Sequence, residues 1–355
     1  MSGSLEPPYG ERDTGGMAAR IDGQPEQIEE ALARGAREPW RVPRARPALL
    51  AVGAMGGSAI AADLSATLYR DRLPRPMVVV REYRWPACVT PDALALLCSY
   101  SGDTEETLAL FDEAGRRGIP RLALTTGGRL ADECRAQEVA FGTLPAGSPP
   151  RAAVFSSWVA ITRLLHSLGW ADDPGAAWSE AAAALRARRE TLGTRSPESA
   201  NPAKRLARAL AGRTVFVYAG SEALGAAATR LRTQFNENAK LLAHSALVPE
   251  LNHNEIVGWE RPGVTHRQAA VLVLRDREDA PAVARRLTLT AEYARRQGAE
   301  VHEISEGGGG RLARLASLVQ WGDYLSLYLA LDSGVDPTPI ASIDEFKRRL
   351  AEVEH

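Results

Sequence analysis

Short apolar runs alternate with longer stretches of helical hydrophobic spacing along most of this 355-residue chain. The strands predicted in the first half are 47–54, 77–80, 94–98 and 121–125. The helices predicted there are 24–37, 58–69, 104–117 and 129–137, with a further helix beginning in the Pro-rich segment 147–158. Short strands that alternate with helices are typical of a parallel sheet covered by helices on both faces.

The same pattern begins again after a polar segment at 194–204. The strands predicted in the second half are 214–218, 269–274 and 300–304, and the helices are 221–239, 280–297 and 311–331, followed by a short helix in the tail. The unit of strand, glycine turn and helix at 214–239 repeats the unit at 49–62. We therefore expect an α/β fold of two doubly wound parallel-sheet domains related by a pseudo-two-fold repeat.

The domain limits are predicted from this repeat. Residues 1–36 are interpreted as a leader, disordered to about residue 20, and an entry helix. Residues 37–190 are expected to form the first domain, and residues 191–355 the second domain together with the C-terminal helix. The boundary is placed near 190–203, where turn-forming Pro, Ser and Asn residues gather.

Composition and charge argue against several classes of partner. Hydrophobic residues make up 45% of the chain and charged residues 25%, and the formal net charge is −1, so no nucleic-acid partner is expected. No apolar run approaches the roughly 18 residues of a membrane-spanning helix, and the polar N-terminus lacks the apolar core of a signal peptide. Three unpatterned cysteines (Cys88, Cys98 and Cys134) predict neither a disulfide framework nor a zinc site, and fit the reducing cytoplasm.

A hydroxyl-rich loop follows the predicted strand 94–98. Ser99, Ser101 and Thr104 precede or begin the next predicted helix, where the helix dipole and free backbone N–H groups favour an anion. The loop therefore predicts a phosphate site without a cation, although no G-x-x-x-x-G-K-[ST] string is present. The alternative is a strand-to-helix turn with a Ser/Thr cap.

Two other turns carry candidate ligand contacts. Gly57 allows the backbone to approach a ligand closely, and the adjacent Ser58 is placed to cap the helix or touch substrate. The spacing is not that of a dinucleotide-binding fingerprint, and close packing of the helix on the sheet is the alternative. Arg151 is the single cation at the start of the helix after 147–150, where it either neutralises phosphate or lies on the surface.

The second half contains the candidate catalytic groups. Glu237 lies near the end of a predicted helix, and His253 follows soon after in the string Asn-His-Asn-Glu. Taken alone, each is as readily a solvent-facing or packed residue. The string around His253 is not H-E-x-x-H, and no cysteine lies nearby, so we expect no metal or other cofactor.

Six motifs stand in one order along the chain. They are Gly-x-Met-Gly-Gly-Ser at 53–58, Ser-Tyr-Ser-Gly at 99–102, Pro-Arg-Ala-Ala at 150–153, Phe-Asn-Glu-Asn-Ala-Lys at 235–240, Asn-His-Asn-Glu at 252–255 and Phe-Lys at 346–347. The loop at 99–107 resembles the phosphate loop of the sugar isomerase (SIS) domain. Together the six motifs resemble the bifunctional phosphoglucose/phosphomannose isomerase family, a branch of the SIS superfamily, over nearly the whole chain beyond residue 20.

The resemblance implies a metal-independent aldose–ketose isomerase that interconverts glucose 6-phosphate and mannose 6-phosphate with fructose 6-phosphate through a cis-enediol. It implies that Glu237 moves the proton between C2 and C1, that His253 acts in opening the sugar ring, and that Lys347 assists this step. The residues implied to bind phosphate are Ser58, Ser99, Ser101, Thr104 and Arg151, with Gly57 giving close backbone approach. It also implies a homodimer whose sites lie at the subunit interface, with His253 supplied by the neighbouring subunit.

Some positions depart from the family pattern. Asp103 replaces an Asn in the phosphate loop and is expected to point away from phosphate, capping the helix; Ala59 and Arg232 also depart from frequent residues. None of these changes removes a proposed catalytic group. The alternatives are a non-catalytic phosphosugar sensor, which would need a DNA-binding module or basic patch, and an isomerase of another phosphosugar. An aminotransferring hexosamine synthase would need an N-terminal glutaminase half, and only a short leader precedes the first predicted domain.

Overall fold

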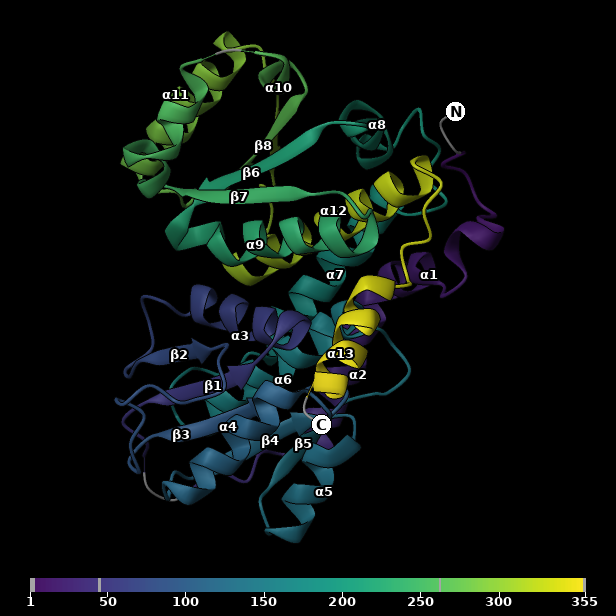
Figure 1. Cartoon of the computed structure of the whole chain (residues 1–355). Helices are drawn as coiled ribbons and strands as arrows, with labels where there is room; N and C mark the ends of the chain where they lie inside the picture. The colour runs from purple at the N-terminus through teal and green to yellow at the C-terminus, as the bar shows by residue number, and fades with distance from the viewer. Residues whose placement is uncertain (1–3, 44–45, 262, 354–355) are drawn as a thin grey trace.

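The computed structural model describes residues 4–43, 46–261 and 263–353 and contains two parallel sheets (Figure 1). The first sheet has the order β2-β1-β3-β4-β5, with β1 (Leu50–Ala54), β2 (Met77–Val80), β3 (Leu94–Cys98), β4 (Arg121–Thr125) and β5 (Phe141–Thr143). The second has the order β7-β6-β8-β9, with β6 (Thr214–Gly220), β7 (Ala243–Val248), β8 (Ala269–Arg275) and β9 (Glu300–Ser305). The predicted α/β fold of two parallel-sheet domains is confirmed.

Helices connect the strands and cover the sheets. The first half contains α1 (Met17–Asp22), α2 (Gln24–Arg37), α3 (Gly56–Leu68), α4 (Glu105–Arg116), α5 (Gly128–Ala136), α6 (Val154–Ser167) and α7 (Gly175–Leu192). The second contains α8 (Pro202–Leu210), α9 (Ser221–Asn238), α10 (Val264–Arg267), α11 (Pro281–Arg296), α12 (Arg311–Asp332) and α13 (Ala341–Val353). Short 3₁₀ turns are η1 (Gly10–Asp13), η2 (Pro150–Ala153), η3 (Glu250–His253) and η4 (Glu255–Trp259).

The two halves meet through helices. Each central strand leads into a helix, β1 into α3 and β6 into α9, and these two helices pack against each other. Figure 1 shows α3 and α9 between the two sheets. Every residue from Leu312 to Asp332 of α12 is buried, and α12 packs against α7, α8 and α9. A helix buried on all sides in this way joins the cores of both halves.

The strands β5 and β7 and the helix α8 are among the elements that were not predicted. The strands β5 and β7 lie at sheet edges and are only partly buried, so they lack the continuous apolar run of a central strand. The helix α8 begins within the polar segment 194–204 and continues beyond it to Leu210. Its sequence signal is nevertheless present, because the Asn201 side chain accepts the amides of Ala203 and Lys204 and Pro202 occupies the first helical position.

The expectation that the leader is disordered to about residue 20 is wrong for the described residues. Leu5 and Met17 are buried, and η1 and α1 form there. Asp13 accepts the amide of Met17 (2.7 Å) and so satisfies a free donor at the start of α1. The polar composition of this segment concealed a few apolar side chains that pack on the rest of the protein.

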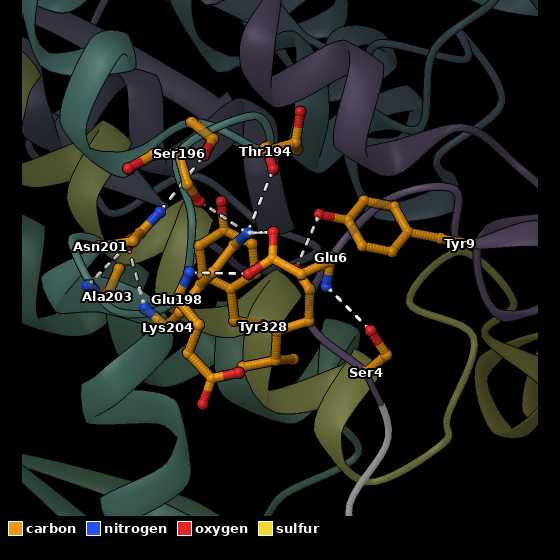
Figure 2. Close-up of polar contacts among 12 residues, drawn as sticks. Ser4, Glu6, Tyr9, Thr194, Ser196, Glu198, Asn201, Ala203, Lys204 and Tyr328 are labelled. Carbon is orange, nitrogen blue, oxygen red and sulfur yellow. Dashed lines mark hydrogen bonds and ion pairs between the residues drawn. The ribbon is translucent and has the colours of Figure 1, made fainter.

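A buried ammonium group attaches this N-terminal segment to the second half. Figure 2 shows Glu6 and Lys204 pointing toward each other. The fully buried Lys204 Nζ donates to Glu6 Oε2 (3.0 Å) and to the carbonyl oxygens of Thr194 (3.1 Å) and Ser196 (2.8 Å), and lies 5.4 Å from the centroid of the Tyr328 ring. These acceptors replace the water that a buried ammonium loses. The contact also orders the connection between α7 and α8.

Glu6 should make a small, pH-dependent contribution to stability. Partial burial raises its pKa, but the Glu198 amide and the Lys204 ammonium outweigh this effect, so its pKa lies below the ordinary value. A lowered folded-state pKa stabilises the fold above the unfolded pKa of about 4.3, and this stabilisation is lost as pH falls through the folded value. We expect Glu6→Gln to cost less than about 1 kcal/mol at pH 7, since the carboxylate is half-exposed, and the difference from wild type to shrink as pH falls below the unfolded pKa. Urea unfolding from pH 3 to 7 measures this, and a difference that grows toward low pH would contradict it.

Candidate active site

The glycine turn after β1 approaches the backbone that carries Arg151. A Cβ at Gly57 would lie 3.0 Å from the carbonyl oxygen of Pro150 and 3.2 Å from Cα of Arg151. The close approach at Gly57 in this structure is to the chain's own backbone, which is the close packing given as the alternative, and the approach to a ligand stays a prediction. Ser58 is buried in the first turn of α3, and it makes no side-chain cap there.

The loop after β3 is ordered by its own hydroxyl groups. Ser99 Oγ and Thr104 Oγ1 are 2.8 Å apart, and Ser99 Oγ also accepts the amide of Gly102 (3.0 Å). Ser101, which is exposed, accepts the amide of Asp103 (3.2 Å). The three hydroxyl residues predicted to bind phosphate thus lie together before α4, whose first-turn amides have no side-chain cap.

Asp103 points away from this loop. Its carboxylate accepts the backbone amide of Arg129 (3.0 Å) in the first turn of α5. The prediction that Asp103 caps the helix following its loop is wrong, because α4 has no side-chain cap and the carboxylate binds the first turn of α5 instead. The loop after β3 packs closely against the turn before α5, since a Cβ at Gly102 would lie 1.9 Å from the carbonyl oxygen of Gly127.

The guanidinium of Arg151 is buried, and both halves of the chain surround it. Nε donates to Asn238 Oδ1 (2.7 Å), and Nη2 donates to the carbonyl oxygens of Pro337 (2.7 Å) and Thr338 (2.8 Å). Nη1 lies 3.6 Å from Glu237 Oε2. Burial lowers the pKa of Arg151, and the Glu237 carboxylate partly offsets this effect. The structure therefore brings together two residues predicted from motifs 86 positions apart, and places Arg151 inside the protein, not on its surface.

Glu237 lies at the end of α9 with its side chain 28% exposed. It lines a cavity of about 620 Å³ with Gly56, and a second cavity of about 600 Å³ with Lys240 on its other side. Lys240 Nζ donates to the carbonyl oxygens of Glu237 (2.8 Å) and Pro337 (3.3 Å). Burial and, less strongly, Arg151 lower the pKa of this ammonium. Lys240 belongs to the motif at 235–240. The sequence could not show its contact with Pro337, because the two residues lie far apart along the chain.

A buried ion pair supports Arg151 from behind, and sequence reasoning missed it. Arg230 Nη2 donates to the carbonyl oxygen of Arg151 (2.9 Å) and to both carboxylate oxygens of Asp323 (2.9 and 2.7 Å). Gln24 (2.6 Å) and Gln234 (2.9 Å) also donate to Asp323. All four side chains are buried. In the sequence, these residues are visible only as polar positions on otherwise apolar helix faces. Such positions do not show which residues pair with each other.

His253 and Lys347 lie elsewhere. Both are exposed, His253 at the end of η3 and Lys347 on α13. Across residues 4–43, 46–261 and 263–353, no hydrogen bond or ion pair joins either of them to Glu237 or Arg151. One chain thus brings Arg151 and Glu237 together, and leaves His253 and Lys347 at its surface.

The described part of the chain lacks the features of two other kinds of site, a metal centre and a membrane-spanning helix. No group of three or more His, Cys, Asp or Glu side chains suited to a metal ion occurs within it. None of its helices combines the length and the apolar character needed to cross a membrane.

Comparisons with known proteins agree with this architecture. A family model described as the bacterial phospho-glucose isomerase C-terminal SIS domain matches residues 199–350. The chain is 35% identical over 330 residues to a bifunctional phosphoglucose/phosphomannose isomerase of Caldicellulosiruptor bescii, covering 93% of this chain and 97% of that one. It is 31% identical over 297 residues to the enzyme of the same name from Aquifex aeolicus, covering 83% and 88%.

A solved structure shows the same fold. The tagatose-6-phosphate ketose/aldose isomerase of Escherichia coli matches with a TM-score of 0.69 at 16% identity, covering 90% of this chain and 94% of that one. An identity of 16% supports the fold alone. The matches to the Caldicellulosiruptor bescii and Aquifex aeolicus proteins have higher identity and extend through both domains. The chain therefore belongs to the bifunctional phosphoglucose/phosphomannose isomerase family.

Proposed function

We propose that this protein interconverts glucose 6-phosphate and mannose 6-phosphate with fructose 6-phosphate through a cis-enediol, without a metal ion. The observation that carries the proposal is the Glu237 carboxylate, which borders a cavity beside the glycine turn of α3 and lies 3.6 Å from the buried Arg151 guanidinium. A carboxylate partly screened from water is suited to take a proton from carbon, and the neighbouring cation fixes its position.

Glu237 removes the proton from C2 of the open-chain aldose and returns it to C1, while O2 loses a proton and O1 gains one. Return of the proton to either face of C2 in the reverse direction yields glucose or mannose 6-phosphate. The phosphate is held by Ser58, Ser99, Ser101 and Thr104 at the N-terminal ends of α3 and α4, where backbone amides and the helix dipole favour an anion. The buried Arg151 holds Glu237 and adds positive charge behind the site.

We further propose that the working unit is a homodimer. The helix α13 exposes Ile343, Phe346 and Leu350, whose spacing of three and four residues places them on one side of the helix. Exposed apolar side chains gathered in this way are typical of a surface covered by a partner. A second copy that covers α13 would allow His253 of one subunit to open the sugar ring beside Glu237 of the other, with Lys347 assisting.

Mixing two defective variants tests this interface. Glu237→Gln and His253→Ala proteins are each expected to be impaired, since each lacks one group in both sites. After subunit exchange, half of the dimers are mixed and carry one intact site, so about one quarter of wild-type activity should return. Native mass spectrometry checks that mixed dimers form. Mixed dimers without recovered activity would show that both groups act within one subunit.

The direct test is turnover of fructose 6-phosphate by purified protein in buffer with a chelator, detecting both aldose products. Formation of glucose 6-phosphate and mannose 6-phosphate is the expected result. Tight binding of the ketose phosphate without turnover would overturn the proposal and favour a phosphosugar sensor.

The three cysteines are free thiols, with Cys98 and Cys134 buried, and we place the protein in the reducing cytoplasm.

A further inference from the structure

The N-terminal segment, residues 4–22, contacts the connection between α12 and α13. Thr14 donates to Asp336 Oδ2 through its backbone amide (3.2 Å) and through its hydroxyl group. A Cβ at Gly15 would lie 2.3 Å from Cγ2 of Thr338, so the two parts of the chain touch at this point. A segment whose composition predicted disorder therefore packs directly on this connection.

The connection between α12 and α13 has few backbone donors with which to hold itself in place. Pro337 and Pro339 lack an amide N–H. The amide of Thr338, which lies between them, donates to Asp336 Oδ1 (2.9 Å). The Asp336 carboxylate thus accepts donors from both sides, from Thr14 and from Thr338, and fixes the direction of the backbone that follows it.

The carbonyl oxygens of this backbone are the acceptors of two cations in the candidate active site. Nη2 of Arg151 donates to those of Pro337 and Thr338. The ammonium of Lys240 also donates to that of Pro337. Partial burial raises the pKa of Asp336, but its hydroxyl and amide donors and, less strongly, Lys240 outweigh this effect, so its pKa lies below the ordinary value. Asp336 is therefore ionised at neutral pH and keeps its donors.

The same N-terminal segment also contacts the loop that leads into η2. Nη1 of Arg20 donates to Ser148 Oγ (2.7 Å), and Nε of Arg20 donates to the carbonyl oxygen of Gly15 (3.2 Å). Ser148 lies three residues before Arg151 in the chain. Arg20 therefore ties the turn at Gly15, which packs on the acceptors of Arg151, to the loop that carries Arg151 itself.

We propose that Asp336 is a positioning residue for the isomerase reaction: held by Thr14, it fixes the carbonyl oxygens that orient the Arg151 guanidinium beside Glu237. This inference rests on the proposed isomerase function. Nη1 of Arg151 lies 3.6 Å from Glu237 Oε2, while Nη2 is bound to the two carbonyls. Because the guanidinium is planar and rigid, a shift of the acceptors of Nη2 also moves Nη1 relative to the carboxylate. A misplacement of about 1 Å at a catalytic group costs as much as about 10²-fold in rate.

The test begins with two variants of Asp336. We expect Asp336→Ala to lower kcat for fructose 6-phosphate about 5- to 50-fold and to leave KM within about threefold of wild type, since no phosphate contact is removed. Asp336→Asn keeps an oxygen atom that accepts the Thr338 amide and should recover most of the loss. Thr14→Val removes one donor to the carboxylate and should lower kcat by about two- to fivefold.

A similar pair elsewhere in the chain provides the matched controls. The exposed Thr90 donates its hydroxyl group to Asp92, and both residues precede β3, at the opposite end of the strand from the phosphate loop. Thr90→Val and Asp92→Ala make the same chemical changes as Thr14→Val and Asp336→Ala. Their kcat values should stay near wild type.

The Nε–H signal of Arg151 reports the position of the guanidinium without turnover. NMR of protein labelled with ¹⁵N-arginine detects this signal, and its absence in Arg151→Lys identifies it. Nε is buried and donates to Asn238 (2.7 Å), so its proton should exchange slowly with water in the wild type. In Asp336→Ala we expect a shifted signal and exchange at least about tenfold faster.

An unchanged Arg151 signal, or a wild-type kcat, in Asp336→Ala would overturn the proposal. A lower melting temperature alone would show only a structural role and would also overturn it. If Asp336→Ala fails to fold, Thr14→Val gives the same two readings. Wild-type protein without turnover would refute the isomerase function, and the Arg151 signal would still test whether Asp336 positions this guanidinium.

Discussion

Replacing Glu237 by glutamine lowers kcat for fructose 6-phosphate isomerisation by about 10²- to 10⁴-fold, the range that general-base catalysis contributes. The amide keeps the size of the carboxylate and its position at the end of α9, but it cannot accept the C2 proton. Because phosphate recognition is assigned to the turns before α3 and α4, KM is expected to stay within about threefold of wild type. Initial rates in both directions measure the two constants.

The matched control for this variant is Glu222→Gln, which makes the same chemical change in the first turn of the same helix. Glu222 is exposed and its pairing with Arg70 is a surface ion pair, so activity should remain near wild type. Hydrogen exchange at C2, followed by NMR in D₂O, separates loss of the proton-transfer step from loss of binding. A Glu237→Gln protein that retained this exchange at the wild-type rate would exclude Glu237 as the base.

Arg230→Met should produce the largest loss of stability, about 3–5 kcal/mol, which is the cost of leaving a buried charge without its partner. Arg230 and Asp323 have side chains only 3% and 2% exposed, so the Asp323 carboxylate would keep only its two glutamine donors. The same variant frees the carbonyl oxygen of Arg151, which should also lower activity in the folded protein. Urea unfolding at pH 7 gives the free energy of unfolding.

Two further variants serve as controls for this result. Arg348→Met removes an arginine whose partner Glu352 is also exposed, and the free energy of unfolding should change by less than about 1 kcal/mol. The double variant Arg230→Met/Asp323→Leu removes both buried charges and should recover much of the lost stability. If Arg230→Met were as stable as Arg348→Met, the buried ion pair would contribute no more to stability than a surface pair.

The local pattern was enough to predict most elements of both sheets. Continuous apolar runs such as 94–98 have few alternatives to a buried strand, and β3 has the predicted limits. The helix at 24–37 was likewise predicted exactly, since its apolar residues recur at helical spacing. The edge strands β5 and β7 and the N-terminal segment were missed because they are stabilised by neighbours far along the chain, as Glu6 is by Lys204.

Part of the candidate site could likewise be predicted from the sequence, and part could not. Motifs identified Ser99, Arg151 and Glu237 as candidates, because residue type and spacing reflect the chemistry of phosphate binding and proton transfer. The sequence could not show that the donors of Arg151 bind acceptors within the protein, or that Arg230 supports Arg151, because each contact depends on groups from distant elements.

The order of strands, glycine turns and helices, and with it the two-domain parallel fold, was therefore determined by local sequence, since periodic apolar positions and turn residues act over a few neighbours. The tertiary structure alone decided which polar groups meet. Packing α3 against α9 and burying α12 brings Arg151, Glu237 and the 337–338 carbonyls together, and the energetic demand that buried polar groups be paired then determines their contacts.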